Sequence, residues 1–177
     1  VERYTRSFNY PETSSVKTAE DLQVYGIKTF FCSNVCAAYR KEIYDKLSNK
    51  KVNVILDTDT YNECDDQFAL SYLIKSKDIF NIEAITVAPF SHLSKNVSVK
   101  KGQDLSYKEI LKICNWLNFD YDNKVFKGSM DYMQNGYDED NDAVNKIIEV
   151  ALRNDKTYIM AIGAITNVAL AIKKEPK

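Results

Sequence analysis

The chain has 177 residues, of which 45% are hydrophobic, so it is long enough to bury a core of its own. Its 24 Lys and Arg residues nearly balance its 25 Asp and Glu residues, which argues against binding of nucleic acid through bulk charge. No stretch approaches the roughly 18 consecutive apolar residues of a membrane-spanning helix. The sequence starts with Val1 rather than with an initiator methionine, and the residues up to Tyr4 do not resemble the start of a signal peptide. We therefore expect a soluble, cytoplasmic protein without a membrane partner, of which this chain is a fragment.

Residues 1–48 have little regular periodicity until their last third. Residues 1–30 are polar and aromatic, and Pro11 interrupts them early, so we expect a loop there. From Asn34 to Leu47 apolar residues recur at helical spacing, which predicts one amphipathic helix. A polar linker, Ser48 to Lys51, follows. We therefore expect a domain boundary here, with one piece over residues 1–48 and a second over 49–177.

The second piece alternates between strand and helix patterns. We expect strands over residues 52–56, 82–88 and 158–162, and helices over residues 66–76, 108–117, 142–153 and 165–173. Strands that alternate with helices are joined by crossover connections, which place the strands parallel to one another. The fold class is therefore α/β, with an open, mostly parallel, Rossmann-like sheet preceded by a loop and a helix.

Cysteine and histidine residues are few and scattered. The four cysteines, Cys32, Cys36, Cys64 and Cys114, come without a secretory signal, so we expect buried free thiols rather than disulfides. The only histidine, His92, lies in a polar loop far from the cysteine pair in the sequence. This scarcity disfavours a zinc site and a nucleophilic triad.

Acidic residues gather where the first predicted strand ends. Asp57 and Asp59 stand at its carboxyl end and share one face, and Asp65 and Asp66 follow at the start of the next helix. Carboxylates this close repel one another unless a cation joins them, and an all-oxygen set favours Ca²⁺ or Mg²⁺. A plainer interpretation makes Asp65 a helix cap, Asp66 a partner of the helix dipole, and the other two turn residues. Aspartate-based phosphotransferases have a similar arrangement, so the spacing alone does not select a reaction.

Two motifs, in the same order as in a known family, carry a resemblance that points to one reaction. Val54 to Asp59, with Asp65 to Leu70 and Ile82 to Ala88 after it, resembles the start of the inosine-uridine-type nucleoside hydrolases. Ala161 to Leu170 is similar to that family's Gly-x-x-Thr-Asn segment. The resemblance covers residues 50–177 and implies a nucleoside hydrolase-type fold. It further implies an N-ribosyl hydrolase that holds Ca²⁺ and acts on a small-molecule nucleoside.

The resemblance also assigns roles by position. It implies that Asp59 binds calcium and accepts a proton from the attacking water, that Asp66 binds calcium through both oxygens, and that Asp65 holds a ribose hydroxyl. Asp57 would support the cluster, and the backbone carbonyl of Ile162 would be a further metal ligand. The family's usual form is Asp-x-Asp-Pro-Gly-x-Asp-Asp, whereas here residues 60–64 make the loop two residues longer and lack the Pro-Gly. Asn62 either substitutes for a substrate-binding asparagine of the family or is a turn residue.

Members of this family continue beyond the point where this sequence stops, with a late His and Asp that complete the site. We therefore expect a truncated domain with weak or no hydrolysis by this chain. The alternatives are a non-catalytic ribose- or nucleoside-binding module and an inactive chimeric fragment. We expect no nucleic-acid partner, and the sequence is compatible with a homo-oligomer.

The first piece resembles a different family. Glu2 to Arg6 and Tyr25 to Arg40 are similar to an internal segment of bacterial inverting rhamnosyltransferases of glycosyltransferase family 2. The likeness ends near Leu47, before the acidic catalytic motif of those enzymes. We therefore interpret residues 1–48 as a non-catalytic remnant.

Overall fold

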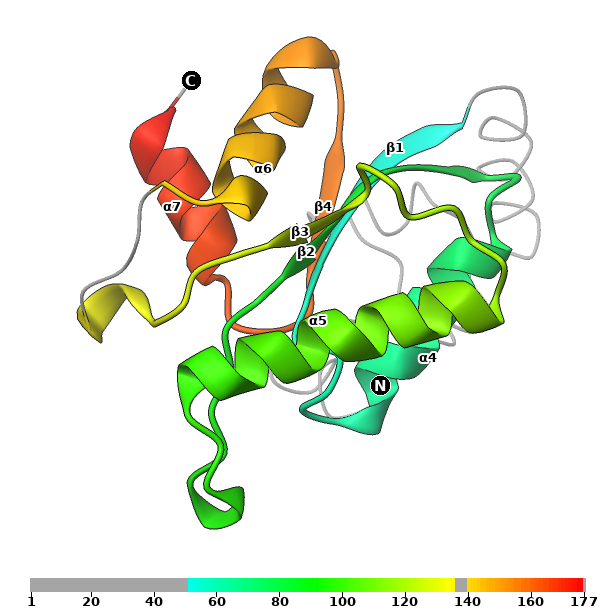
Figure 1. Ribbon diagram of the computed structural model, residues 1–177. Helices are drawn as coiled ribbons and strands as arrows, with labels where there is room; N and C mark the ends of the chain where they lie inside the picture. Colours follow the sequence, from blue (N-terminus) through cyan, green and yellow to red (C-terminus); the bar gives the residue numbers. More distant parts are fainter. Residues whose placement is uncertain (1–50, 136–139, 177) are drawn as a thin grey trace, which may run out of the picture. The chain divides into compact units, whose positions relative to one another are not determined.

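The computed structural model describes residues 51–135 and 140–176 (Figure 1). The chain divides into two units between Lys50 and Lys51, and the description below concerns the second. The loop and the helix expected within residues 1–48 lie outside the described residues. No helix of the described part is long and apolar enough to cross a membrane.

The described residues form a 4-stranded sheet in which neighbouring strands are parallel. Its strands are β1 (Val52–Thr58), β2 (Phe80–Val87), β3 (Val125–Lys127) and β4 (Tyr158–Ala161), in the order β3-β2-β1-β4. Leu56 of β1 pairs with Ile85 on one side and with Met160 on the other. The predicted fold class, an α/β protein with an open parallel sheet, is confirmed.

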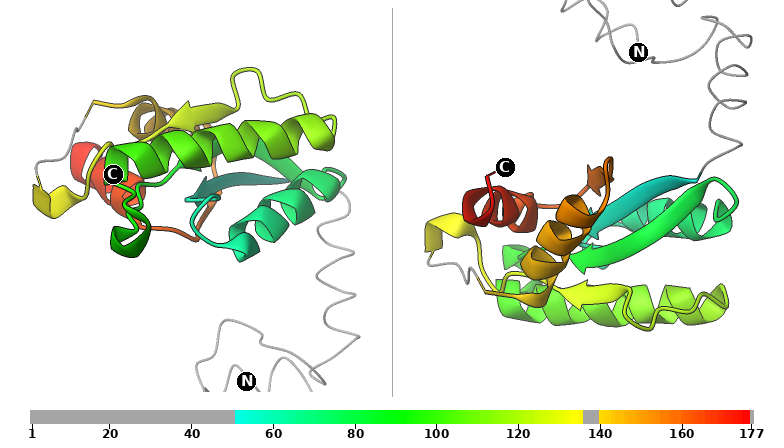
Figure 2. Two further views of the ribbon diagram at one scale, coloured as in Figure 1. Left: turned by 60° about the horizontal axis from the view of Figure 1, so that its bottom comes forward. Right: turned by 90° about the horizontal axis from the view of Figure 1, so that it is seen from above.

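Helices cover both faces of this sheet (Figures 1 and 2). On one face α4 (Cys64–Lys75) and α5 (Val99–Trp116) pack against Val54, Leu56 and Ile85. On the other face α6 (Asp142–Arg153) and α7 (Thr166–Lys174) pack against Ile55 and Ala84. Because side chains alternate along a strand, the continuous apolar run of β1 supplies both cores at once.

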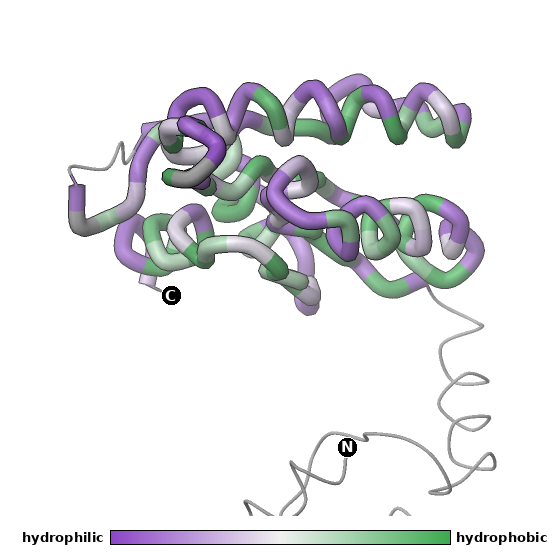
Figure 3. Tube along the Cα trace, turned by 90° about the horizontal axis from the view of Figure 1, so that it is seen from below, coloured by the Kyte–Doolittle hydropathy of each residue, from purple (hydrophilic) through white to green (hydrophobic). Residues whose placement is uncertain are grey.

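Helix starts follow local capping chemistry in two cases. The Ser98 side chain accepts a hydrogen bond from the backbone of Lys101 at the start of α5, and Asn141 accepts one from Val144 at the start of α6. Along α5, hydrophobic and hydrophilic residues alternate at the helical period (Figure 3), and Ile110, Ile113 and Cys114 are its buried apolar positions.

Several element boundaries differ from the prediction. Helix α5 begins at Val99 rather than at residue 108. Its first turns do not appear in the sequence pattern because they contain Gly102, which disfavours a helix. In the structure a glycine is needed at this position, where the helix meets the chain at Phe90. A Cβ on Gly102 would lie 2.1 Å from the Phe90 carbonyl oxygen. Strand β3 was not predicted, because its three residues are too few to show a periodicity. Cys114 is buried as expected, but Cys64 is exposed at the first position of α4, so a buried thiol there was a wrong prediction.

The strand order places a topological switch point beside β1. The chain leaves β1 through α4 toward β2 on one side, whereas β4, on the other side of β1, is reached through α6 on the opposite face. In open parallel sheets, ligands bind at the carboxyl ends of strands that flank such a point. Here those strands are β1 and β4.

Candidate functional site

Asp59 follows β1 directly and is buried, with 6% of its surface exposed. Its Oδ2 accepts a hydrogen bond of 3.1 Å from Nδ2 of Asn62, and its backbone carbonyl accepts one from the Asn62 amide. Burial raises the pKa of the Asp59 carboxyl to about 6, and the nearby negative charge of Asp66 adds to the rise. Asn62 is thus both a turn residue and a partner of the predicted catalytic carboxylate.

Asp66 lies in the first turn of α4 and is also buried, at 6% exposure. Its Oδ1 accepts a hydrogen bond of 2.5 Å from Oγ1 of Thr58, the last residue of β1. Burial raises the pKa of Asp66, and the carboxylates of Asp65 and Glu63 raise it further. The longer loop therefore still brings Asp66 to the end of β1, close enough to Asp59 for their charges to interact.

Asp65 differs from its neighbour, because its side chain is exposed to solvent. The capping position of α4 is occupied by Glu63, which makes no side-chain capping hydrogen bond. The plainer interpretation of Asp65 as the helix cap is therefore wrong, since the helix begins at Cys64. As a first-turn residue, Asp65 complements the helix dipole and leaves its carboxylate available to a ligand in solution.

Asp57 is completely buried within the sheet end. Its Oδ1 accepts hydrogen bonds from Oγ1 of Thr86 at 2.7 Å and from Nδ2 of Asn167 at 2.9 Å. Its Oδ2 has no hydrogen-bond partner among the described residues. Burial raises the pKa of Asp57 to about 6, against the lowering effect of the two hydrogen bonds, and the charge of Asp59 raises it slightly more.

The chain that follows β4 lies beside these carboxylates, because β4 is the neighbour of β1 in the sheet. The amide of Ile162 donates a hydrogen bond of 2.9 Å to the backbone carbonyl of Asp57, so the chain after β4 stays beside β1. Gly163 follows, and a Cβ at this position would lie 2.8 Å from Oδ1 of Asp59. The structure thus brings Ile162 and Gly163 together with the carboxylates, although about a hundred residues separate them in the sequence.

Asn167 also lies at this end of the sheet, although the sequence assigned it no role. It belongs to the Gly-x-x-Thr-Asn segment, which was the signal available, but nothing in the sequence indicated its partners. In the structure it is fully buried and bonds to Asp57, to the carbonyl of Val87 and to the amide of Ser129. It therefore connects the ends of β1 and β2 with the segment after β3.

The donor chemistry of this region fits a hard cation, because Asp59 and Asp66 offer buried oxygens whose mutual repulsion a cation would relieve. The partnerless oxygen of Asp57 also indicates a missing polar neighbour. Within residues 51–135 and 140–176, no group of three or more Asp, Glu, His or Cys side chains is arranged to hold a metal ion. An ion at this place would therefore also need other oxygens, from the main chain or from water.

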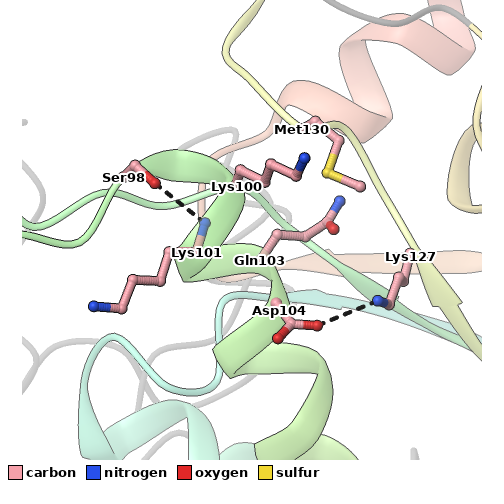
Figure 4. Close-up of a pocket in the computed structure, with 7 residues that line it drawn as sticks. All are labelled: Ser98, Lys100, Lys101, Gln103, Asp104, Lys127 and Met130. Atoms are coloured by element: carbon pink, nitrogen blue, oxygen red, sulfur yellow. Dashed lines mark hydrogen bonds and ion pairs between the residues drawn. The ribbon is translucent and has the colours of Figure 1, made fainter.

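A separate cavity of about 360 Å³ opens beside the first turns of α5 and the end of β3 (Figure 4). It is lined by Ser98, Lys100, Lys101, Gln103, Asp104, Lys127 and Met130. Gln103 is buried and donates to the carbonyls of Gly128 and Ser129, which fixes one wall. None of the predicted site residues lines this cavity.

The fold and the placement of the acidic residues define a class. In open parallel α/β sheets, small-molecule enzymes commonly bind their ligands at the switch point, which is where this domain carries buried carboxylates. Residues 54–177 match the model of the inosine-uridine preferring nucleoside hydrolases, and the chain belongs to this family. Membership supports hydrolysis of nucleosides as the kind of reaction.

The chain is also partly similar to two curated glycosyltransferases. It is 41% identical over 58 residues to the O-antigen chain rhamnosyltransferase RfbN of Salmonella typhimurium, and 36% identical over 58 residues to WbaN of Salmonella anatum. In both cases the match covers 33% of this chain but 18% of the relative, so the predicted resemblance to a segment of rhamnosyltransferases is confirmed. No solved structure matches this chain.

Proposed function

We propose that this protein hydrolyses the N-glycosidic bond of ribonucleosides in a calcium-dependent reaction that yields ribose and the free base. One observation carries the proposal. Two buried carboxylates of raised pKa, Asp59 and Asp66, interact at the switch point of a domain that belongs to a nucleoside hydrolase family.

The residues that would hold the cation are Asp59, Asp66 and the carbonyl of Ile162, with Asp57 in support. A calcium ion bound there would lower the pKa of a bound water and attract ribose hydroxyl oxygens. The three protein groups come from the end of β1, the start of α4 and the end of β4. A substrate that reaches all three would lie across the carboxyl ends of the neighbouring strands β1 and β4.

The chain's own residues divide the remaining tasks. Asp59 accepts the proton of the attacking water, since it lies buried beside Asp66, where that water would be held. Asp65, exposed in the first turn of α4, accepts a hydrogen bond from a ribose hydroxyl. Asn62 holds the Asp59 carboxylate at 3.1 Å and lies beside the same substrate. The negative charges of the cluster stabilise the positive charge that develops on the sugar.

A second candidate function is a module that binds ribose or nucleosides without turnover. It is favoured by the lack of a group of three metal-binding side chains among the described residues, because an ion held by fewer groups is less firmly placed. An inactive chimeric fragment is the third candidate, favoured by the partial similarity to rhamnosyltransferases.

Ribose release from inosine and uridine, measured by a reducing-sugar assay in calcium and in a chelator, tests the proposal. The matched variants are Asp59→Asn, which removes the base, and Asp120→Asn, which alters an exposed carboxylate elsewhere. From this chain we expect at most weak, calcium-dependent release, which Asp59→Asn abolishes and Asp120→Asn leaves unchanged. Calorimetric binding of nucleoside without any release would instead support the binding module, and neither binding nor release would support the inactive fragment.

A further inference from the structure

The segment between β4 and α7 is flanked by two hydrogen bonds to the same residue of β1, Asp57. Its first amide, that of Ile162, donates 2.9 Å to the backbone carbonyl of Asp57. Just after the segment, in the first turn of α7, the Asn167 side chain donates a hydrogen bond of 2.9 Å to Oδ1 of the same Asp57. The loop that carries the Ile162 carbonyl is therefore attached to β1 at both ends.

Asn167 is itself held on every side. Its Nδ2 also donates 3.0 Å to the carbonyl of Val87, and its Oδ1 accepts 2.9 Å from the amide of Ser129. The side chain is 0% exposed, so these partners replace water completely. A buried amide satisfied in this way has one well-defined position, because any other would leave polar groups unpaired.

Gly128 gives an independent indication that this position matters. A Cβ on Gly128 would lie 2.3 Å from Nδ2 and 2.4 Å from Oδ1 of Asn167, and 2.3 Å from the Val87 carbonyl. Every residue other than glycine would therefore displace the Asn167 amide. The chain has only 5 glycines, and one of them stands where Asn167 needs the space.

We propose that Asn167 is a positioning residue: by attaching the start of α7 to Asp57 of β1, it fixes the Ile162 carbonyl for the cation. This inference rests on the proposed function, in which that carbonyl is a metal ligand. Asn167 does not itself bind the ion, because its side-chain amide is hydrogen-bonded to Asp57, Val87 and Ser129. Residues that orient metal ligands typically affect metal affinity by about 10–100-fold when they are replaced.

The test compares Asn167→Ala with Thr86→Val in the full chain. Thr86 is buried and donates to the same oxygen of Asp57, but it lies on β2 and does not hold the loop, so its variant is a matched control for loss of a buried hydrogen bond. We expect calorimetric titration with calcium to show an affinity about 10–100-fold weaker for Asn167→Ala, and close to wild type for Thr86→Val. Equal affinities in the two variants would overturn the proposal.

A second readout needs no calcium. Hydrogen exchange at the Ile162 amide reports whether the loop is still attached to β1. We expect faster exchange there in Asn167→Ala than in Thr86→Val, relative to the global stability of each, and an equal rate would overturn the proposal. If Asn167→Ala does not fold, Asn167→Ser, which keeps a polar group, takes its place. A wild-type chain that binds no calcium would contradict the proposed function, whereas the exchange comparison would still decide whether Asn167 holds the loop.

Discussion

Gly163 and Asp59 approach each other so closely that a side chain does not fit between them. A Cβ on Gly163 would stand 2.8 Å from Oδ1 of Asp59 and 3.1 Å from the Cβ of Ala88. The carboxylate that follows β1 is therefore in contact with the backbone that follows β4, at the end of the sheet where we propose that a cation binds.

This contact predicts the effect of Gly163→Ala. The added methyl group would push the Asp59 carboxylate away, because the side chain moves more easily than the backbone. We expect little change in the melting temperature of the calcium-free protein and loss of most of the stabilisation by calcium. That stabilisation is worth about 2.7 kcal/mol when calcium is at 100 times its dissociation constant. Thermal unfolding with and without calcium measures the melting temperature of the free protein and its increase with calcium. An increase as large as that of wild type would contradict the contact.

Asp66→Asn and Asp65→Asn form a matched pair on α4. Asp66 is buried and its pKa is raised, whereas Asp65 is exposed. We expect Asp66→Asn to maintain or increase stability without calcium, since it removes a poorly solvated charge, and to abolish the calcium effect. Asp65→Asn should keep calcium stabilisation and weaken nucleoside binding. The metal assignment is wrong if calcium stabilises Asp66→Asn as much as wild type.

Stability should depend on pH through Asp57 and Asp59. Both have a pKa of about 6 in the folded chain against an ordinary value of 3.8, so the folded state binds more protons between these values. Without calcium, their contribution to the unfolding free energy therefore falls as the pH rises from about 4 to 6, and then levels off. We expect Asp59→Asn to make this fall smaller in denaturant titrations, and stabilisation by calcium to grow over the same range. A wild-type curve parallel to that of Asp59→Asn would contradict the raised pKa of Asp59.

The opposite end of the sheet is predicted to serve stability alone. Glu83 is 8% exposed, its Oε2 lies 2.5 Å from Nη2 of Arg153, and its Oε1 accepts hydrogen bonds from Asn81 and Asn154. Glu83→Ala would remove three hydrogen bonds to a buried carboxylate, which should lower the unfolding free energy by about 1–3 kcal/mol. The exposed Glu149, which also pairs with Arg153, is the control, and Glu149→Ala should cost at most about 1 kcal/mol. Calcium binding should be unchanged in both variants, as measured by titration calorimetry.

The sequence by itself determined the class of fold and the location of the carboxylates. Continuous apolar runs and helical periodicity arise from local burial, so β1, β2, α6 and the carboxyl end of β1 could be recognised from neighbouring residues alone. The same local patterns missed β3, which has three residues, and the first turns of α5, where Gly102 serves a contact with Phe90.

Only the tertiary structure decided which acidic residues are buried together and what holds them. Asp65 and Asp66 are adjacent in the sequence, yet one is exposed and the other is buried against Thr58. Asn167 reaches Asp57 across 110 positions of the chain, and Gly128 makes room for it from a third segment. Such contacts depend on how strands are ordered in the sheet, and a hydrogen bond between residues that far apart has no pattern in the sequence around either partner.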